Sequence, residues 1–254
     1  MATATATVTE ASEGLQGRMW RELQAAAGES TIPFTEVLGS VKRRPSSENL
    51  TIDAYAEQHR EEFDSLLALA GDEGWTFNRE EDGVRAFLKS VEGSDLMYFK
   101  GVADIEVEGG LARILHVILN IEERPSWDEQ CVKGSSEQFF PPFYKYTYTQ
   151  TGPLAAVVSA REMLTVGRFR FEEDGTFLFS LRSTEYEDMP LDDKLVRTNL
   201  REGGYIIRPK EGSKTEFSIT WTGCLDPCGW IPKWVVNKVM PKQALALAKV
   251  KKLF

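Results

Sequence analysis

The sequence holds few residues of the kinds that build metal, disulfide or nucleophilic sites. Its 254 residues include three cysteines and two histidines. An odd, low number of cysteines is typical of a reducing compartment without a disulfide framework. Cys224 and Cys228 lie close together, but a zinc site needs further ligands and only His59 and His116 are left to supply them. The sequence therefore predicts neither a metal nor another cofactor.

Long apolar runs are also missing. No stretch of about 18 apolar residues occurs, so no membrane-spanning helix is predicted. The first residues, MATATATVTEASEG, lack the basic start and the apolar stretch of a secretory signal. Together with the low cysteine count, these absences predict a cytoplasmic protein.

Positive charge is scarce over most of the chain. Lys and Arg number 30 against 39 Asp and Glu, which gives a formal net charge of -9. A nucleic-acid-binding surface needs the opposite balance, so nucleic acid is not a predicted partner. Residues 229–254 depart from this average, because they contain lysines and no acidic residue. An anionic partner is therefore expected to meet this local basic segment.

The composition divides the chain into an extension and one domain. Residues 1–50 are predicted to be a partly flexible N-terminal extension with a short helix over 15–27, and a protein partner for it is unknown. Within it, the run Arg43-Arg44-Pro45-Ser46 resembles a basophilic kinase site, and the alternative is an unmodified serine in a flexible linker. Residues 51–254 are predicted to form a single folded domain.

The apolar periodicity of this domain predicts an α+β fold. Helical spacing indicates helices over 51–70 and 111–121 and a long helix after Gly229, which Pro241 is expected to kink. Alternating residues and short turns indicate antiparallel strands over 75–80, 84–90, 96–107, 131–140, 143–151, 162–171, 176–185, 196–207 and 215–224. A long antiparallel sheet that curls around the last helix encloses a concave apolar volume, which is the expected ligand site.

Four segments carry a family resemblance, and they occur in the family's order. They are EDGVRAFLKSVEGS, RPSWDEQ, SAREMLTV and GWIPKWVVNKVMPKQ. From about Thr51 to Phe254 the chain resembles the START (StAR-related lipid-transfer) domains, in particular the phosphatidylcholine-transfer-protein-like members. The resemblance implies the helix-grip fold, a curved antiparallel β-sheet wrapped around a long C-terminal helix with an internal lipid tunnel. It also implies lipid binding or transfer without catalysis or metal.

Arg124 and Asp128 are the first candidate head-group residues. They lie four apart at the end of a helix and can pair there. The resemblance places both in the tunnel, where a planar guanidinium suits a phosphate because it donates two parallel hydrogen bonds. The alternative is an exposed helix ion pair, which contributes about 0.3–0.5 kcal/mol.

Three further head-group candidates follow from alignment with choline-binding relatives. Tyr148 matches an aromatic cage position, while Met163 and Arg201 stand where aromatic residues are usual. This substitution favours a more anionic head group than choline, although Tyr148 is alternatively an ordinary sheet aromatic and Arg201 alternatively faces water. Gly167 stands at the Arg position of the sterol-binding pair, which favours a roomier tunnel and a two-chain lipid.

The tunnel gate is expected at an apolar loop and the last helix. The segment TGPLAAVVSA has five consecutive apolar residues, and the family resemblance puts it beside the terminal helix. The predicted gate and membrane-contact residues are Leu154, Val157, Val158, Trp230, Trp234, Val235, Val239, Lys249, Lys251 and Lys252. The alternatives are a loop that packs on the helix and a solvated basic face.

The sequence thus predicts a non-enzymatic carrier. It binds a single phospholipid-like lipid in an internal hydrophobic tunnel and transfers it between membranes, with transient contact at an anionic membrane surface. The alternatives are a sterol or other lipid carrier or sensor that acts as a lipid-gated interaction module, and a helix-grip-fold enzyme. No nucleophile elbow, glycine-rich phosphate loop or metal-ligand spacing favours the enzyme.

Overall fold

The computed structural model describes residues 14–29, 41–43, 51–71, 73–140, 144–153, 158–231 and 233–254. The helices are α1 (Leu15–Glu29), α3 (Ile52–Gln58), α4 (Arg60–Ala70), α5 (Gly110–Leu119), a 3-10 turn at Arg124–Ser126, α6 (Lys233–Ala244) and α7 (Ala246–Lys251). The strands are β1 (Val41–Arg43), β2 (Thr76–Glu81), β3 (Val84–Ser90), β4 (Met97–Glu106), β5 (Cys131–Phe140), β6 (Tyr144–Thr151), β7 (Arg161–Phe171), β8 (Phe177–Ser183), β9 (Val196–Arg197), β10 (Asn199–Pro209) and β11 (Glu216–Asp226).

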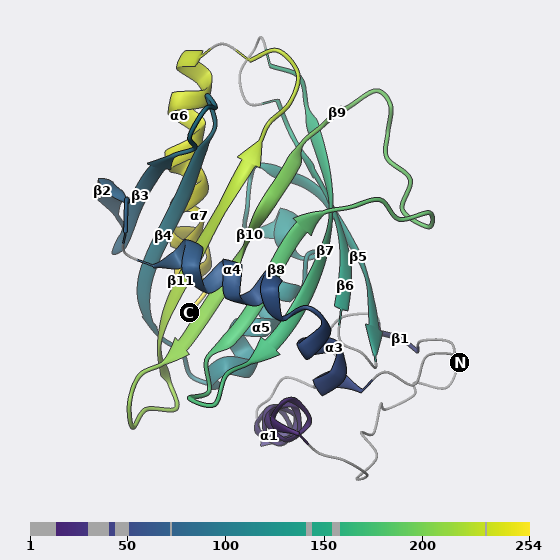
Figure 1. Cartoon of the computed structure of the whole chain (residues 1–254), viewed down its shortest axis with the longest axis vertical. Helices are drawn as coiled ribbons and strands as arrows, with labels where there is room; N and C mark the ends of the chain where they lie inside the picture. The colour runs from purple at the N-terminus through teal and green to yellow at the C-terminus, as the bar shows by residue number, and fades with distance from the viewer. Residues whose placement is uncertain are drawn as a thin grey trace.

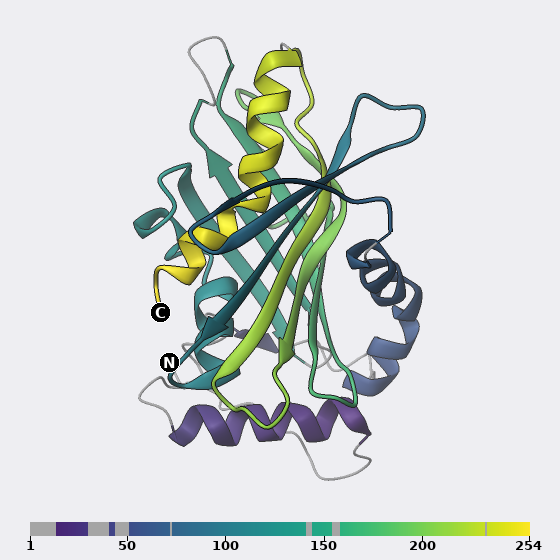
Figure 2. The same cartoon turned by 90° about the vertical axis from the view of Figure 1, so that its left-hand side faces the viewer.

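One curved sheet organises the molecule. Its strand order is β1-β5-β6-β7-β8-β10-β11-β4-β3-β2, and β9 pairs with β7. Neighbours are antiparallel except for the parallel pairs β1–β5 and β7–β9. The sheet curves around α6 and α7, which contact β4, and α6 also contacts β3 (Figures 1 and 2). The predicted helix-grip fold is confirmed.

The two faces of the sheet bury different side chains, as strand geometry requires. Phe177 and Phe179 on β8 belong to the main core on the concave face, which also contains residues of α5 and α7. Leu178, between them, belongs to a smaller cluster with Phe63 and Leu66 of α4. The sheet is therefore covered on its concave side by α5–α7 and on part of its convex side by α4.

The N-terminal extension is part of this packing. Trp20 and Leu23 of α1 are 3% and 5% exposed and belong to the main core. The Gln16 side chain donates to the carbonyl oxygen of Phe171 and accepts from its backbone N–H, both at 2.7 Å. Side-chain packing therefore continues across the boundary predicted between residues 50 and 51, because α1 buries Trp20 against the end of the sheet. Ser46 lies outside the described residues.

The last helix differs from its prediction in the place where it is interrupted. Pro241 lies inside α6, and the break falls at Leu245. Next to the break, the carbonyl oxygen of Gln243 accepts a hydrogen bond from the Trp221 indole N–H at 3.1 Å. A Cβ at Gly101 would lie 2.1 Å from the Ala244 carbonyl oxygen, so only glycine permits this approach of α6 to β4. The predicted helix over 51–70 is likewise divided, at His59.

Candidate functional site

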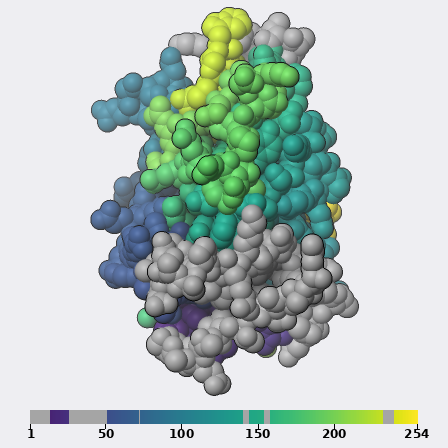
Figure 3. Space-filling view, turned by 90° about the vertical axis from the view of Figure 1, so that its right-hand side faces the viewer, coloured from purple at the N-terminus to yellow at the C-terminus, as the bar shows by residue number. Residues whose placement is uncertain are grey.

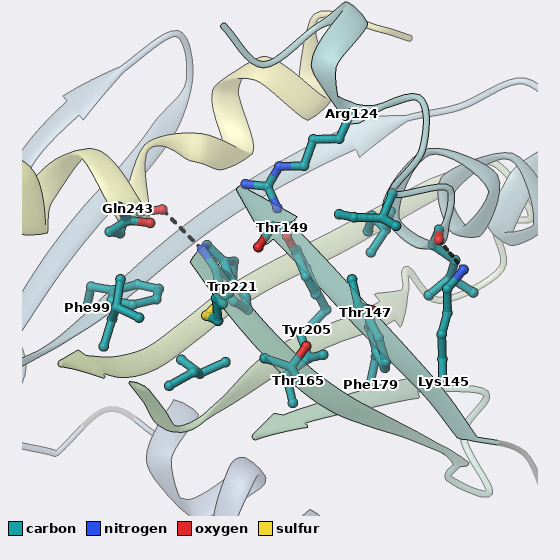
Figure 4. Close-up of a pocket in the computed structure, with 17 residues that line it drawn as sticks. Phe99, Arg124, Lys145, Thr147, Thr149, Thr165, Phe179, Tyr205, Trp221 and Gln243 are labelled. Carbon is teal, nitrogen blue, oxygen red and sulfur yellow. Dashed lines mark hydrogen bonds between the residues drawn. The ribbon is translucent and has the colours of Figure 1, made fainter. Parts of the chain in front are cut away.

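A cavity of about 90 Å³ lies between the concave face of the sheet, the end of α5 and the end of α6 (Figure 4). This central cavity is lined by Phe99, Ile118, Leu119, Ile121, Arg124, Lys145, Thr147, Thr149, Met163, Thr165, Phe179, Leu181, Leu200, Tyr205, Trp221, Leu225 and Gln243. Pockets that bury small molecules are usually about 300–1,000 Å³. The described state is therefore closed, and the central cavity has to widen before it can hold a molecule of that size.

Arg124 brings a charge to the cavity wall from the turn after α5. Its Nε atom donates to Oδ2 of Asp128 at 2.9 Å, and no described residue accepts from its two Nη atoms. Figure 4 shows the guanidinium reaching toward Thr149. Burial acts to lower the pKa of Arg124, but Tyr205 and Asp128 raise it, so the guanidinium is charged.

Asp128 holds two cations at once. Its Oδ1 atom accepts from the Lys249 ammonium at 2.8 Å, while Oδ2 accepts from Arg124. Burial acts to raise the pKa of Asp128, but Arg124 and Lys249 together hold it below the usual carboxyl value. The carboxylate is ionised at neutral pH and connects the Arg124 turn to α7.

Lys249 therefore differs from the prediction that it faces outward. Its ammonium is 2.8 Å from both Asp128 and Glu129, and its side chain is 27% exposed. The physical reason is local, because two carboxylates on the turn after α5 lie opposite this position of α7. Lys252 pairs with Asp82 at 2.6 Å and is 66% exposed, and Lys251 is half-buried.

Tyr148 and Arg201 lie outside the central cavity, contrary to the predicted cage. Thr147 and Thr149 line the cavity, so Tyr148 between them points to the opposite face, where its hydroxyl donates to Glu162 at 3.2 Å. A displacement of one residue in the alignment reverses the face of a strand side chain. Arg201 follows a β-bulge after Leu200, is 48% exposed and lies 3.6 Å from Asp226.

The outer face of β6 is covered by aromatic contacts. The Tyr186 ring stacks on Tyr146 with ring centroids 4.1 Å apart, and its hydroxyl donates to Glu137 at 2.7 Å. Tyr186 belongs to the segment between β8 and β9, which projects from the side of the molecule shown in Figure 3. Tyr146 and Tyr148 therefore pack on the face of β6 that points away from the cavity.

Gly167 does not enlarge the cavity as expected. A Cβ at this position would lie 2.1 Å from Cε2 of Phe179 and 3.1 Å from a methyl carbon of Leu181. The Phe179 ring, stacked on Phe169 at 4.6 Å, fills the space that the missing side chain leaves. The glycine therefore accommodates an aromatic residue of the next strand.

The predicted gate residues are only partly described. Leu154 and Val157 lie outside the described residues, as do the side chains of Trp234 and Val235. Val158 is buried at 2% exposure, whereas Trp230 is 78% exposed. Val239 is half-buried and is not among the residues that line the central cavity, where Gln243 represents α6.

Lys145 is the charged residue of the cavity that the sequence prediction missed. Its side chain is 1% exposed, and its ammonium donates to the carbonyl oxygen of Leu119, the last residue of α5. Burial lowers the pKa of Lys145 to about 8, against the attraction of Glu122. The signal was present in KYTYTQT, where Lys145, Thr147 and Thr149 share one face and the tyrosines share the other.

Neither a metal-binding cluster nor a membrane-spanning helix is found in the described part of the chain. Within it, no group of three His, Cys, Asp or Glu side chains is arranged to hold a metal ion. The helices of the same ranges are all too short or too polar to cross a bilayer.

Comparisons with known proteins identify the fold family. The model of the START domain matches residues 56–252. The mitochondrial steroidogenic acute regulatory protein of Gallus gallus is 23% identical over 242 residues, covering 90% of this chain and 84% of that protein. An uncharacterized protein of Pseudomonas aeruginosa is 25% identical over 178 residues, covering 68% of this chain and 84% of its own length.

Solved structures show the same architecture. Human STARD10 matches with a TM-score of 0.65 and 22% identity, covering 76% of this chain and 78% of that chain. Human StAR-related lipid transfer protein 5 also gives a TM-score of 0.65, at 20% identity, and the match covers 79% of this chain and 96% of that chain. At these identities the likeness shows a shared fold.

Proposed function

Because the chain belongs to the START domain family, we propose that it binds one phospholipid-like lipid in the central cavity and transfers it between membranes without catalysis. The observation that carries this proposal is the Arg124 guanidinium in the cavity wall, with Nε engaged by Asp128 and both Nη atoms without an acceptor among the described residues. The name of human StAR-related lipid transfer protein 5 describes the same activity for that structural relative.

The remaining donors of Arg124 suit the phosphate of a lipid head group. A guanidinium donates parallel hydrogen bonds to two oxygens of one phosphate, and such charge-assisted bonds are strong where water is excluded. Asp128 and Lys249 hold the guanidinium in place, while the apolar walls of the cavity, such as Ile118 and Leu181, take the acyl chains. Met163 lies in the same wall but supplies no charge.

Lipid entry is proposed at the end of the molecule where β6 ends and α6 begins (Figures 1 and 2). Trp230 stands there with 78% of its surface exposed, and tryptophan is favoured at the membrane–water interface. The predicted gate at residues 154–158, of which the structure describes only Val158, is proposed to open so that the closed cavity widens. Lys251 and Lys252 remain proposed contacts to an anionic leaflet, whereas Lys249 is engaged by carboxylates.

A transfer assay between vesicles tests this function. Wild-type protein is expected to move fluorescent phosphatidylglycerol from donor to acceptor vesicles, and Arg124→Met is expected to lose uptake while its circular dichroism spectrum is unchanged. Arg201→Met is the matched control, because it removes an arginine that lies outside the cavity. Equal transfer by Arg124→Met and wild type contradicts the head-group role, and binding without transfer indicates a lipid sensor.

The location of the gate is tested separately with Trp230→Ala. This exposed residue contributes little to the core, so the variant is expected to bind lipid at equilibrium but to transfer it several-fold more slowly. An equal loss of binding and transfer would contradict a role in membrane contact.

A further inference from the structure

The central cavity has a second cation, at the end away from Arg124. Lys145, Thr147 and Thr149 project from the inner face of β6 into the cavity wall. Successive residues of a strand advance about 3.3 Å, so the Cα atoms of Lys145 and Thr149 are about 13 Å apart. Figure 4 shows Thr149 beside Arg124 and Lys145 on the far side of Thr147. The cavity therefore has a positive side chain at each end, with threonine hydroxyl groups between them.

The surroundings of Lys145 make this end of the cavity polar. Gln138 is its direct partner across the β5–β6 ladder and is 0% exposed. Both the amide nitrogen and the amide oxygen of Gln138 lack a hydrogen-bond partner within the described structure. Thr165, on the neighbouring strand β7, adds a hydroxyl to the same wall. Gln138 does not itself line the cavity, so Lys145, Thr147 and Thr165 are the polar residues that a chain end placed here would meet.

A structural role for Lys145 is the competing explanation. The Leu119 carbonyl oxygen belongs to the last turn of α5, where backbone acceptors lack helical partners and a cation is favoured. This role explains one hydrogen bond of the ammonium. It does not explain why a lysine stands in the cavity wall, where burial disfavours its charge.

We propose, on the basis of the lipid-binding function above, that Lys145 determines specificity and selects lipids whose chain carries a carboxylate at the end away from Arg124. A carboxylate there accepts a charge-assisted hydrogen bond from the ammonium, whereas a terminal methyl group accepts none. The hydroxyl groups of Thr147 and Thr165 are placed to donate to the same carboxylate.

The decisive experiment compares two acids of equal chain length. The full-length chain is titrated with dodecanoic acid and with dodecanedioic acid at pH 7, and binding is followed by calorimetry. Wild type is expected to bind the diacid about tenfold or more tightly, as a charge-assisted hydrogen bond predicts. Lys145→Met is expected to lose this preference. The matched control Lys133→Met removes a lysine exposed on β5 and keeps the preference.

The outcomes separate specificity from structure and from the broader function. A loss of thermal stability with an unchanged diacid preference in Lys145→Met assigns Lys145 a capping role and overturns the proposal. Lys145→Gln provides a second variant that removes the charge and keeps an amide donor. If wild type transfers phospholipid but prefers neither the diacid nor a phospholipid with a carboxyl-terminated chain, this inference fails alone. If it binds neither the acids nor phospholipid, the proposed function fails as well.

A second pair of probes identifies the source of the carboxylate. Palmitoyl-azelaoyl-phosphatidylglycerol carries a carboxyl group at the end of one chain, and palmitoyl-nonanoyl-phosphatidylglycerol lacks it. A preference for the first that disappears in Lys145→Met assigns the selected group to a phospholipid chain. A preference seen only with the free acids assigns it to a dicarboxylic acid. An absence of preference in both pairs overturns the proposal.

Discussion

The two ends of the central cavity each carry a positively charged side chain, but the surroundings of the two side chains differ. Arg124 faces a carboxylate at 2.9 Å, and the pKa of that carboxylate is lowered. Lys145 donates to a backbone carbonyl group, and burial lowers its own pKa to about 8. The first cation is stabilised by an ionised partner, whereas burial acts against the charge of the second. A cavity wall can therefore contain one cation that is permanently charged and another whose charge a ligand would stabilise.

The largest effect on the difference between the two ends is expected from removing the Asp128 carboxylate. Asp128→Asn leaves Arg124 and Lys249 without their shared acceptor, and the free energy of unfolding is expected to fall by about 3 kcal/mol, as for breaking a buried pair. Urea denaturation at pH 7 measures this loss.

The pH dependence of the Asp128 variant provides its control. The folded-state pKa of Asp128 is below its unfolded value, so its contribution is present above the unfolded pKa and is lost as pH falls through the folded pKa. The difference between wild type and Asp128→Asn should shrink in acid. A difference that is constant down to pH 2 would contradict the ion-pair explanation.

At Lys145 the free energy of unfolding is also expected to rise with pH, but in the alkaline range and because burial disfavours the charged form. Because its folded pKa of about 8 is below the unfolded value, the unfolded chain binds more protons between these two values and wild-type stability rises with pH in that interval. Relative to Lys145→Met, wild type should gain roughly 3 kcal/mol from pH 7.5 to pH 11. Paired urea denaturation curves at these pH values measure the gain. A constant difference between the two proteins would show that the ammonium is not desolvated.

A smaller loss of stability is expected when Lys249, the second partner of Asp128, is replaced. Lys249→Met removes the link between Asp128 and α7 but leaves Arg124 in place, so the expected loss is about 1 kcal/mol for a partly exposed pair. Thermal unfolding measures it. Lys252→Met, at the residue that follows α7 and paired with Asp82 at the surface, is the control and should leave the midpoint unchanged. Equal effects of the two variants would remove the special role of Asp128.

The fold was predictable because its signals are local. Alternation and turns located the strands, and a helical stripe located α5, since these patterns depend on residues that are neighbours in sequence. The position of α1 was not predictable in the same way. Trp20 and Leu23 find their partners in the sheet and α5, which are distant in sequence, so the amphipathic pattern predicted a helix without its contacts.

The prediction of site residues succeeded where the sequence spacing alone fixed which residues pair. Arg124 and Asp128 form a pair whose spacing fixes it, and the structure places them together. On β6 the prediction chose the face of Tyr148, because this residue matches an aromatic cage position of the choline-binding relatives. Both faces of this strand are covered by other residues, so the pattern of hydrophobic residues does not show which face lines the cavity. The cavity-facing Lys145 was therefore assigned no role.

The pairing of β1 with β5 has a consequence for handling the protein. Without β1, residues Gln138–Phe140 of strand β5 would lose their partner and present unpaired backbone groups at one edge of the sheet. Uncovered edges of this kind promote edge-to-edge self-association. A fragment trimmed to the family match at residue 56 would lose both β1 and the buried face of α1. Truncation before residue 56 should therefore produce concentration-dependent aggregates in light scattering.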